Sequence, residues 1–250
     1  MLQKVIAFPL LLVSSVAWAA NTSSLTTGFD YSSGKYGGTT STDILYIPVI
    51  GRYQTDEYYL KLTVPYISVS SAGSVVRGTG PIKKNTTTNI TTQSGLGDVV
   101  ASAGYTVFEN DKLLLDLVGN IKLGTADASK NLGTGANDYS TQLDGFHTIK
   151  KTTSFATAGY KMIGAPAGIN VNNIIYATLG FSQKISDTIR AGMLLDIAQS
   201  SSNISPGSRE LSFFVSNKLN KTSKIQAGLM KGFSDGSPDF GFSVMITGAI

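Results

Sequence analysis

Residues 112–124 read KLLLDLVGNIKLG, and bulky apolar side chains alternate with polar or small ones along this stretch. One side of an extended strand here would carry Leu113, Leu115, Leu117, Ile121 and Leu123. The other side would carry Asp116, Asn120 and Lys122. A period of two residues indicates a β-strand with two chemically different faces, so the stretch predicts a strand at the boundary between an apolar and a polar environment.

The same alternation recurs along the chain, with turn residues between the segments. We interpret twelve segments as antiparallel strands: 23–33, 42–53, 57–70, 95–107, 112–124, 138–149, 153–162, 173–183, 188–199, 208–219, 223–233 and 239–249. Most of them are longer than the roughly 5–6 residues of a strand in a soluble fold and are long enough for a tilted membrane strand, which needs about 9–11. Periodicity alone does not distinguish a soluble β-sandwich from a membrane barrel, in which the bulky side chains face lipid and the polar ones face the lumen.

The first nineteen residues have the order of features found in a secretory signal. Lys4 precedes an apolar run, and Ala17-Trp18-Ala19 forms an A-x-A cleavage site. Only 14% of the residues are charged, against about 25% in a typical soluble domain. Export, long strands and sparse charge together favour the membrane barrel. We therefore expect a cleaved signal peptide at 1–19 and an all-β, up-and-down transmembrane barrel of about twelve strands at 20–250.

The connections between the predicted strands alternate between short and long. The short ones are 54–57, 108–112, 150–151, 184–187 and 220–222. The long ones are 34–42, 71–94, 125–137, 163–172, 200–208 and 234–239. Bacterial outer-membrane barrels have short periplasmic turns and longer external loops, so this pattern predicts an even strand number with both ends of the chain in the periplasm.

Charged and amide side chains on the polar faces are the candidate functional residues. They are Arg52, Lys61, Asp98, Asp116, Lys122, Gln142, Asp144, Lys161, Arg190, Asp196 and Glu210. Two interpretations remain open: a network that braces the wall, because charges facing a narrow lumen must pair or stay hydrated, or a polar constriction that selects solutes. We expect Asp98, Asp116, Asp144, Lys122, Lys161 and Arg190 to lie in one polar layer, with Asp98 closer to the external rim than Asp116.

Two further features concern the strands themselves. Eight tyrosines near strand ends are expected to form interfacial girdles: Tyr31, Tyr36, Tyr53, Tyr58, Tyr66, Tyr105, Tyr139 and Tyr160. Segment 42–53 is apolar on both faces and carries Pro48, and the next segment carries Pro65. Because proline cannot donate to a β-ladder, we expect a local defect between these two strands where something packs in the lumen.

Catalytic and cofactor chemistry finds little support. The chain has one histidine, His147, and no cysteine, and it contains no nucleophile motif or metal-ligand cluster. The basic residues are too dispersed to indicate nucleic-acid binding. We expect no enzyme, no cofactor, no metal and no nucleic acid.

Several stretches together resemble a family of proteobacterial outer-membrane barrels described as transporters and linked by name to the meta-pathway of phenol degradation. They are FDYSSGKYGGTTSTDILYIPV (29–49), LKLTVPYISV (60–69), SGLGDVVASAGY (94–105), KLGTADASKNLGTGANDYSTQLD (122–144) and LMKGFSDGSPDFG (229–241). The resemblance implies a monomeric or weakly associated barrel that passes small compounds, hydrophobic ones among them, and it implies no catalytic residues.

The sequence thus predicts a channel or transporter in the bacterial outer membrane, with the lipid bilayer and a small solute as partners and a monomer as the assembly. The first alternative is a structural or surface-interaction barrel without transport, and a second is an outer-membrane lipid enzyme. Whether the lumen is open is expected to depend on whether loop 71–94, or the residues before the first strand, fold inward.

The topology can be tested with single cysteines at Thr87 and Asn110, labelled on intact cells with a reagent that does not cross the outer membrane. Thr87→Cys lies in a long loop and should be labelled, whereas Asn110→Cys lies in a short turn and should be protected. Labelling of Asn110→Cys alone would reverse the orientation.

Overall fold

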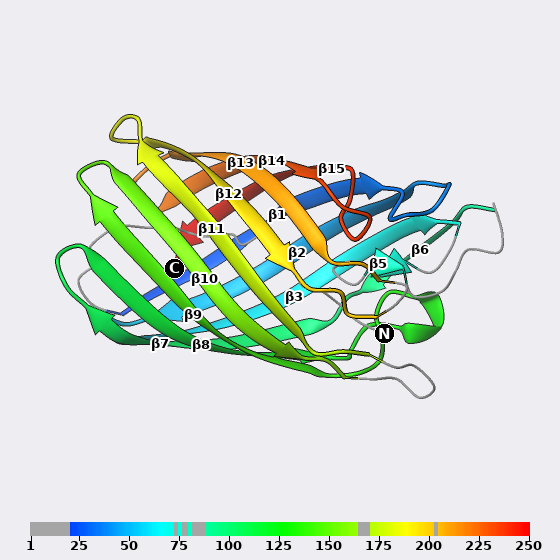
Figure 1. The fold of residues 1–250 in the computed structure, drawn as a ribbon. Helices are drawn as coiled ribbons and strands as arrows, with labels where there is room; N and C mark the ends of the chain where they lie inside the picture. The colour runs from blue at the N-terminus through cyan, green and yellow to red at the C-terminus, as the bar shows by residue number, and fades with distance from the viewer. Residues whose placement is uncertain (1–20, 73–74, 77–79, 82–88, 165–170, 203–204) are drawn as a thin grey trace.

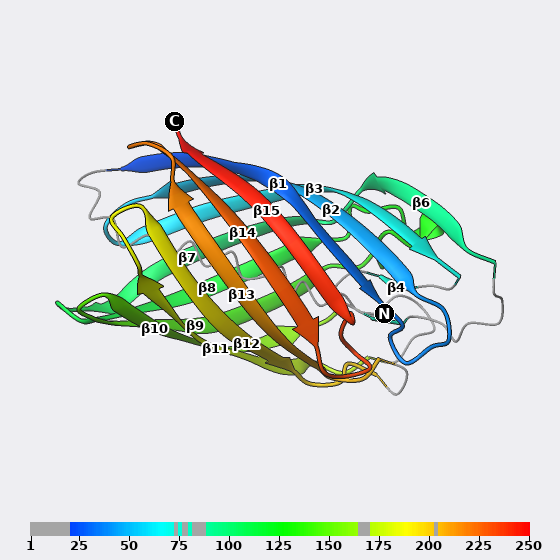
Figure 2. The ribbon, with the colours of Figure 1, turned by 90° about the horizontal axis from the view of Figure 1, so that it is seen from above.

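The computed structural model describes residues 21–72, 75–76, 80–81, 89–164, 171–202 and 205–250, so the predicted signal peptide at 1–19 lies outside the described residues. Within these ranges, twelve strand passes form one closed antiparallel barrel (Figures 1 and 2). Eleven passes are single strands: β1 Thr22–Gly34, β2 Thr42–Gln54, β3 Tyr58–Ser71, β8 Leu113–Leu123, β9 Asp138–Ile149, β10 Thr152–Met162, β11 Ile174–Lys184, β12 Ile189–Ala198, β13 Ser208–Lys218, β14 Ser223–Gly232 and β15 Phe240–Ala249. The twelfth pass consists of β6 Thr91–Leu96 followed by β7 Val99–Glu109.

Neighbouring strands in the chain are also neighbours in the sheet. The order runs from β2 through β1 and β15 back to β7 and β3, and the pairing of β2 with β3 closes the circle. Two further elements are not part of the barrel sheet: Val75–Val76 (β4) and Gly80–Pro81 (β5) form a small two-stranded sheet, and Ala128–Lys130 form a 3₁₀ turn. The all-β barrel and the twelve predicted strands are confirmed. Among the described residues, no helix is long and apolar enough to cross a membrane.

The connections divide the barrel into two ends. The turns between β2 and β3, β7 and β8, β9 and β10, β11 and β12, and β13 and β14 are short and lie at one end, which we call the turn end. The longer connections lie at the opposite end, the loop end (Figure 1). Thr22 pairs with Gln54, and the chain ends at Ile250, whose N–H donates to the Ser23 carbonyl oxygen, so β1 begins and β15 ends at the turn end (Figure 2).

The β-ladder keeps one side of every strand in the lumen. Asp116 of β8 pairs directly with Asp144 of β9, and the next residue, Leu117, pairs with Leu143. The first pair faces inward and the second faces outward, because successive side chains of a strand point to opposite faces. The faces inferred from sequence for 112–124 are therefore those that the barrel uses.

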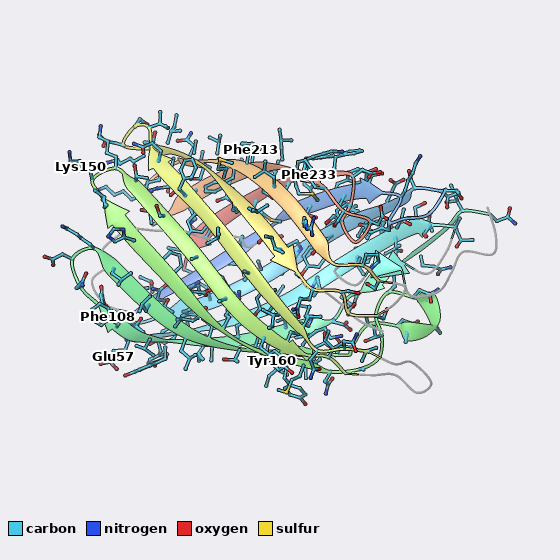
Figure 3. The ribbon with its side chains drawn as sticks, viewed as in Figure 1. Glu57, Phe108, Lys150, Tyr160, Phe213 and Phe233 are labelled. Atoms are coloured by element: carbon cyan, nitrogen blue, oxygen red, sulfur yellow. The ribbon has the colours of Figure 1, made fainter. Side chains whose placement is uncertain are left out.

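The outer surface is an apolar belt. Outward side chains from strands around the barrel remain exposed, among them Leu117 at 50%, Leu179 at 58% and Leu229 at 65%. Figure 3 shows Phe108, Tyr160 and Phe213 on this surface. A soluble barrel would bury such residues, whereas lipid is the solvent that this surface matches, so the chain spans a membrane with its strands.

Tyrosines contribute to both rims of this belt. Tyr58 and Tyr105 pair across β3 and β7 at the turn end, and both are exposed. Tyr139 and Tyr160 are exposed near the loop end. Amphipathic rings at these two levels match the lipid–water interfaces.

The predicted ladder defect between 42–53 and the following strand is wrong in its position. Pro48 pairs directly with Pro65, and the register between β2 and β3 runs without interruption from Asp43 to Gln54. The interruptions lie on the far edges of the two strands. On one side the β1–β2 ladder lacks pairs at Gly28 and Phe29. This placement follows because facing prolines can direct their missing donors away from each other, toward the outer neighbours.

On the other side, Pro65 faces the break between β6 and β7. Tyr66 pairs with Leu96, whereas Thr63 pairs with Val100, so the β6–β7 pass has one residue more than β3 over this interval. The Gly97 N–H still donates to the Pro65 carbonyl oxygen at 2.8 Å. This bulge bends the pass and leaves Asp98 buried on the lumen side.

The two faces can be tested by substitution on one strand. Leu117→Arg places a charge in the apolar belt and should lower the free energy of unfolding by about 2–4 kcal/mol. Asn120→Arg, on the lumen face of the same strand, loses one side-chain hydrogen bond to Ser140 and should cost about 1 kcal/mol. Urea unfolding in lipid vesicles measures both values, and an equal cost would contradict a lipid-facing surface at Leu117.

Candidate functional site

A row of acidic and threonine side chains crosses the lumen wall from β7 to β13. The register makes consecutive neighbours of Thr106, Asp116, Asp144, Thr157, Thr178, Asp196 and Glu210, which we call the acidic row. It begins near the turn end and finishes near the loop end, because the strands of a barrel are tilted. Four carboxylates are thus distributed along a rising path on one wall.

Threonine hydroxyls from neighbouring strands hold three of these carboxylates. Thr106 donates to Asp116 at 2.8 Å, Thr157 donates to Asp144 at 2.6 Å, and Thr178 donates to Asp196 at 2.5 Å. Hydrogen bonds to a charged acceptor are stronger than neutral ones, so each carboxylate is held on the wall.

A second row, rich in basic and small polar residues, lies parallel to the first. It comprises Ser24, Arg52, Lys61, Ser102, Asn120, Ser140 and Lys161, which we call the basic row. The carbon at the centre of the Arg52 guanidinium lies 3.9 Å from the centroid of the Tyr59 ring, and Arg52 Nε donates to Gln54 at 3.1 Å. These contacts fix the direction of the guanidinium near the turn end.

Tyr59 lies on the lumen wall between the acidic row and the basic row, where direct cross-strand pairs link it through Gly104 and Val118 to Gln142. Gln142 donates to both oxygens of Asp144 at 2.8 and 2.9 Å, and accepts a hydrogen bond from the Tyr176 hydroxyl at 2.7 Å. Arg52 lies within electrostatic reach of Asp116 and Asp144. Among the described residues, however, no carboxylate lies within ion-pair distance of it. The lower lumen therefore has opposite charges facing each other without contact.

Near the loop end, the charges are buried and paired. Lys122 Nζ lies 3.3 Å from Asp98 Oδ2 and 3.4 Å from Asp138 Oδ2, and Lys161 Nζ lies 3.0 Å from the same Asp138 oxygen. We call these four residues the ion cluster. The Lys122 side chain is only 4% exposed. A buried cation between two carboxylates is stabilised only while all partners are present.

The loop at 124–137 folds inward over this cluster, and we call it the inner loop. The Ala126 N–H donates to Asp98 Oδ1 at 2.9 Å, and Thr134 Oγ1 lies 3.4 Å from Lys122 Nζ. Leu132 is 1% exposed and packs with Ala126 against three apolar side chains of β2 and β3. These three are Ile44, Ile67 and Val69, and all have lumen-facing register positions. The inner loop therefore narrows the lumen at the loop end.

Large side chains elsewhere in the lumen lie flat on the wall. Four inward glycines are each paired directly with an aromatic residue of the next strand, and a Cβ at any of these glycines would come within 2.5 Å of the ring. The pairs are Gly104 with Tyr59, Gly159 with Tyr176, Gly180 with Phe155, and Gly192 with Phe214. Because glycine has no side chain, each ring covers its neighbour instead of projecting across the lumen.

Two of these rings belong to an apolar patch on the lumen wall. Phe155, Leu194 and Phe214 are buried together, and Phe146 packs against them. The lumen wall thus contains a packed apolar cluster beside the charged rows.

The structure separates the predicted residues into groups at different depths. Asp98, Lys122 and Lys161 lie in the ion cluster, whereas Arg52, Lys61, Asp116, Gln142 and Asp144 lie lower. Arg190 lies at the turn end and donates to Ser182 at 3.0 Å, and Asp196 and Glu210 lie near the loop end on β12 and β13. The expected single polar layer is wrong: Asp116 and Lys122 are six residues apart on one strand, or about 20 Å. The expected order of Asp98 above Asp116 agrees with the structure.

Several residues of the site were not singled out from the sequence. Asp138 has the inward parity of its strand, so the alternation could have identified it. The threonines of the acidic row have the same signal. Leu132 is an apolar residue in a polar loop, which could have indicated that the loop packs inward.

The described residues show no grouping of three or more His, Cys, Asp and Glu side chains suited to a metal ion. His147 is exposed on the outer face of β9, close to the turn end.

A closed barrel with an apolar outside and a charged inside has the fold of bacterial outer-membrane channels. It is similar to the crystal structure of an outer membrane channel from Pseudomonas putida F1, with a TM-score of 0.73 and 12% identity over 94% of this chain and 97% of that one. It is also similar to the KdgM porin in complex with disordered oligogalacturonate, with a TM-score of 0.56, 11% identity and coverage of 91% and 99%. The NanC porin has a TM-score of 0.58, 9% identity and coverage of 90% and 100%.

These likenesses show the fold. No protein-family profile matches the chain. No curated protein matches it either.

The ion cluster predicts a large effect of removing its central cation. Lys122→Met leaves Asp98 and Asp138 facing each other in a buried site and should lower the free energy of unfolding by about 3–5 kcal/mol. Lys130→Met, in the inner loop, removes an exposed pair with Asp127 and should change the free energy of unfolding by less than about 1 kcal/mol. Urea unfolding, followed by the difference in gel mobility between the folded and the unfolded barrel, measures both free-energy changes. Comparable small effects would mean that the cluster does not stabilise the barrel.

Proposed function

We propose that this chain is an outer-membrane channel that passes small solutes. The observation that carries the proposal is the lower lumen, where Arg52 faces Asp116 and Asp144 without ion-pair contact. Separated opposite charges are tolerated where water or a polar solute lies between them, and they produce a field that acts on whatever passes. A barrel that only braces itself would gain more by pairing them, as it does in the ion cluster.

The solutes handled by proteins of similar fold support this proposal. One protein of similar fold is an outer membrane channel, and another is a porin in complex with oligogalacturonate. A third is the CymD monoaromatic hydrocarbon channel, with a TM-score of 0.51 and 10% identity over 92% of this chain and 88% of that one. We therefore include small amphipathic and hydrophobic compounds among the solutes, as the resemblance to the family named for the meta-pathway of phenol degradation implies.

The proposal also covers orientation, export, assembly and partners. The loop end faces the outside of the cell and the turn end faces the periplasm, after export directed by the signal at 1–19. The channel works as a monomer, with the bilayer as its surroundings, and it has no catalytic activity, cofactor or nucleic-acid partner. His147 acts as an interfacial residue, since it lies on the lipid-facing side at the turn end.

A structural barrel without transport is the second candidate, and the inner loop is the observation that favours it. Leu132 and Ala126 narrow the lumen, and the buried ion cluster holds the loop in place. In this case the lumen charges brace the wall and the external loops carry the function.

Single-channel recording in planar bilayers distinguishes the two candidates. The wild-type barrel should give ohmic steps, and Asp116→Asn combined with Asp144→Asn should shift its ion preference toward anions, because negative charge is removed from the lower lumen. Asp235→Asn combined with Asp239→Asn removes the same charge from exposed positions between β14 and β15 at the loop end and should shift it much less, because salt screens distant charges.

Silence of the wild-type barrel, together with lowered thermal stability of the Asp116 and Asp144 variant, would establish the structural role instead. If neither conductance nor stability responds to the pair, both interpretations of these residues are wrong.

A further inference from the structure

Five of the lumen cations fall into two groups with different surroundings. Lys122 and Lys161 contact carboxylates in the ion cluster. Arg52, Lys61 and Lys224 do not: among the described residues, none of the three lies within 4 Å of a carboxylate oxygen. The barrel therefore pairs these two cations near the loop end and leaves the other three without an ion-pair contact.

These three cations gather on one part of the wall, which we call the basic pocket. Arg52 and Lys61 are direct cross-strand neighbours on β2 and β3. Lys224 of β14 pairs with Thr247, whose hydroxyl bonds to that of Thr26 at 2.8 Å on the lumen side. The Arg52 charge repels both lysines at this separation. All three side chains remain partly exposed, so an ion entering the lumen can reach them.

The nearby carboxylates of Asp116 and Asp144 attract these cations across the lumen but do not contact them. Asp144 already accepts hydrogen bonds from Gln142 and Thr157, and Asp116 accepts one from Thr106. These bonds hold Asp116 to β7 and Asp144 to β9 and β10, and neither carboxylate contacts the cations. Like charges concentrated in a narrow, partly dehydrated lumen raise the free energy of the folded barrel, and an anion bound between them lowers it.

The orientation of Arg52 suits such a ligand. Its guanidinium is held against the Tyr59 ring and by Gln54, which leaves its terminal N–H groups available to the lumen. A planar guanidinium of fixed direction matches the two oxygens of a carboxylate or the oxygens of a phosphate, and two lysine ammonium groups add charge without directional demand.

We propose that Arg52, Lys61 and Lys224 form an anion-binding subsite in the lower lumen, which takes a small organic anion carrying a carboxylate or phosphate group. The solute binds by its anionic group to the three cations. This subsite rests on the proposed function for its transport role, but binding itself does not require conduction.

Calorimetry on the detergent-solubilised full-length barrel tests the subsite directly, with benzoate as the carboxylate probe and inorganic phosphate as the phosphate probe. At least one of them should bind saturably to the wild type. Lys61→Gln combined with Lys224→Gln should weaken that binding at least about tenfold, because each lost charge-assisted contact is worth roughly a factor of ten.

Lys231→Gln is the matched control, because Lys231 lies on β14 like Lys224 but is exposed on the outer face. It should leave the affinity unchanged. A second measurement guards against misfolding: relief of repulsion should raise the thermal midpoint of the Lys61 and Lys224 double variant without ligand, while the probe should raise the midpoint of the wild type only.

The outcomes separate the subsite from the channel. Saturable binding by a barrel that gives no current supports the subsite and overturns the proposed function. Conduction without binding of either probe, or equal affinity in wild type and double variant, overturns the subsite and leaves the channel. Preference for benzoate identifies a carboxylate ligand, and preference for phosphate identifies a phosphate ligand.

Discussion

Every strand of this barrel depends on one constraint: in lipid, backbone N–H and C=O groups must find partners within the chain, because no water is present to receive them. Closure of β2 on β3 satisfies this requirement around the whole circumference. It also leaves little freedom elsewhere. Where Pro48 and Pro65 lack donors, the ladder is interrupted on the outer edges of β2 and β3, and the resulting bulge at Gly97 to Val99 is what brings Asp98 into the lumen.

The same closure determines which residues meet. Once the parity of each strand is set, tilt turns direct cross-strand neighbours into rising rows, so that Asp116 and Glu210 belong to one path although nearly a hundred residues separate them. The depth of a charged residue in the lumen then determines whether it contacts an opposite charge. In the ion cluster, carboxylates and ammonium groups are in contact and shielded by the inner loop, whereas lower in the lumen the Arg52 guanidinium is separated from the carboxylates and stays partly exposed.

The sequence predicted those parts of the molecule that depend on local periodicity. The twelve strands follow from alternation with a period of two, and the two ends follow from connection lengths, which the structure reproduces. The depth of a residue was not predictable, because it depends on the register between strands, and this is why Asp98 and Arg190 were wrongly expected in one layer. The inner loop was missed for a related reason: Leu132 is drawn inward by Ile44 and Ile67, which lie far away in sequence. The edge chosen by the proline defect was equally inaccessible, since it depends on which side of each strand its donors face.

The pairing of inward glycines with aromatic rings has a consequence for how such a barrel can change. The number of strands sets the circumference of the barrel. The free width of the lumen also depends on whether rings such as those of Phe155 and Tyr176 lie flat against Gly180 and Gly159 or project into the lumen. A glycine-to-alanine substitution at one of these positions would displace the ring toward the lumen, because the added methyl group occupies its place. Point mutations can therefore change the width of the lumen while the backbone hydrogen bonds between the strands are kept. Barrels with the same number of strands can in this way come to admit solutes of different size.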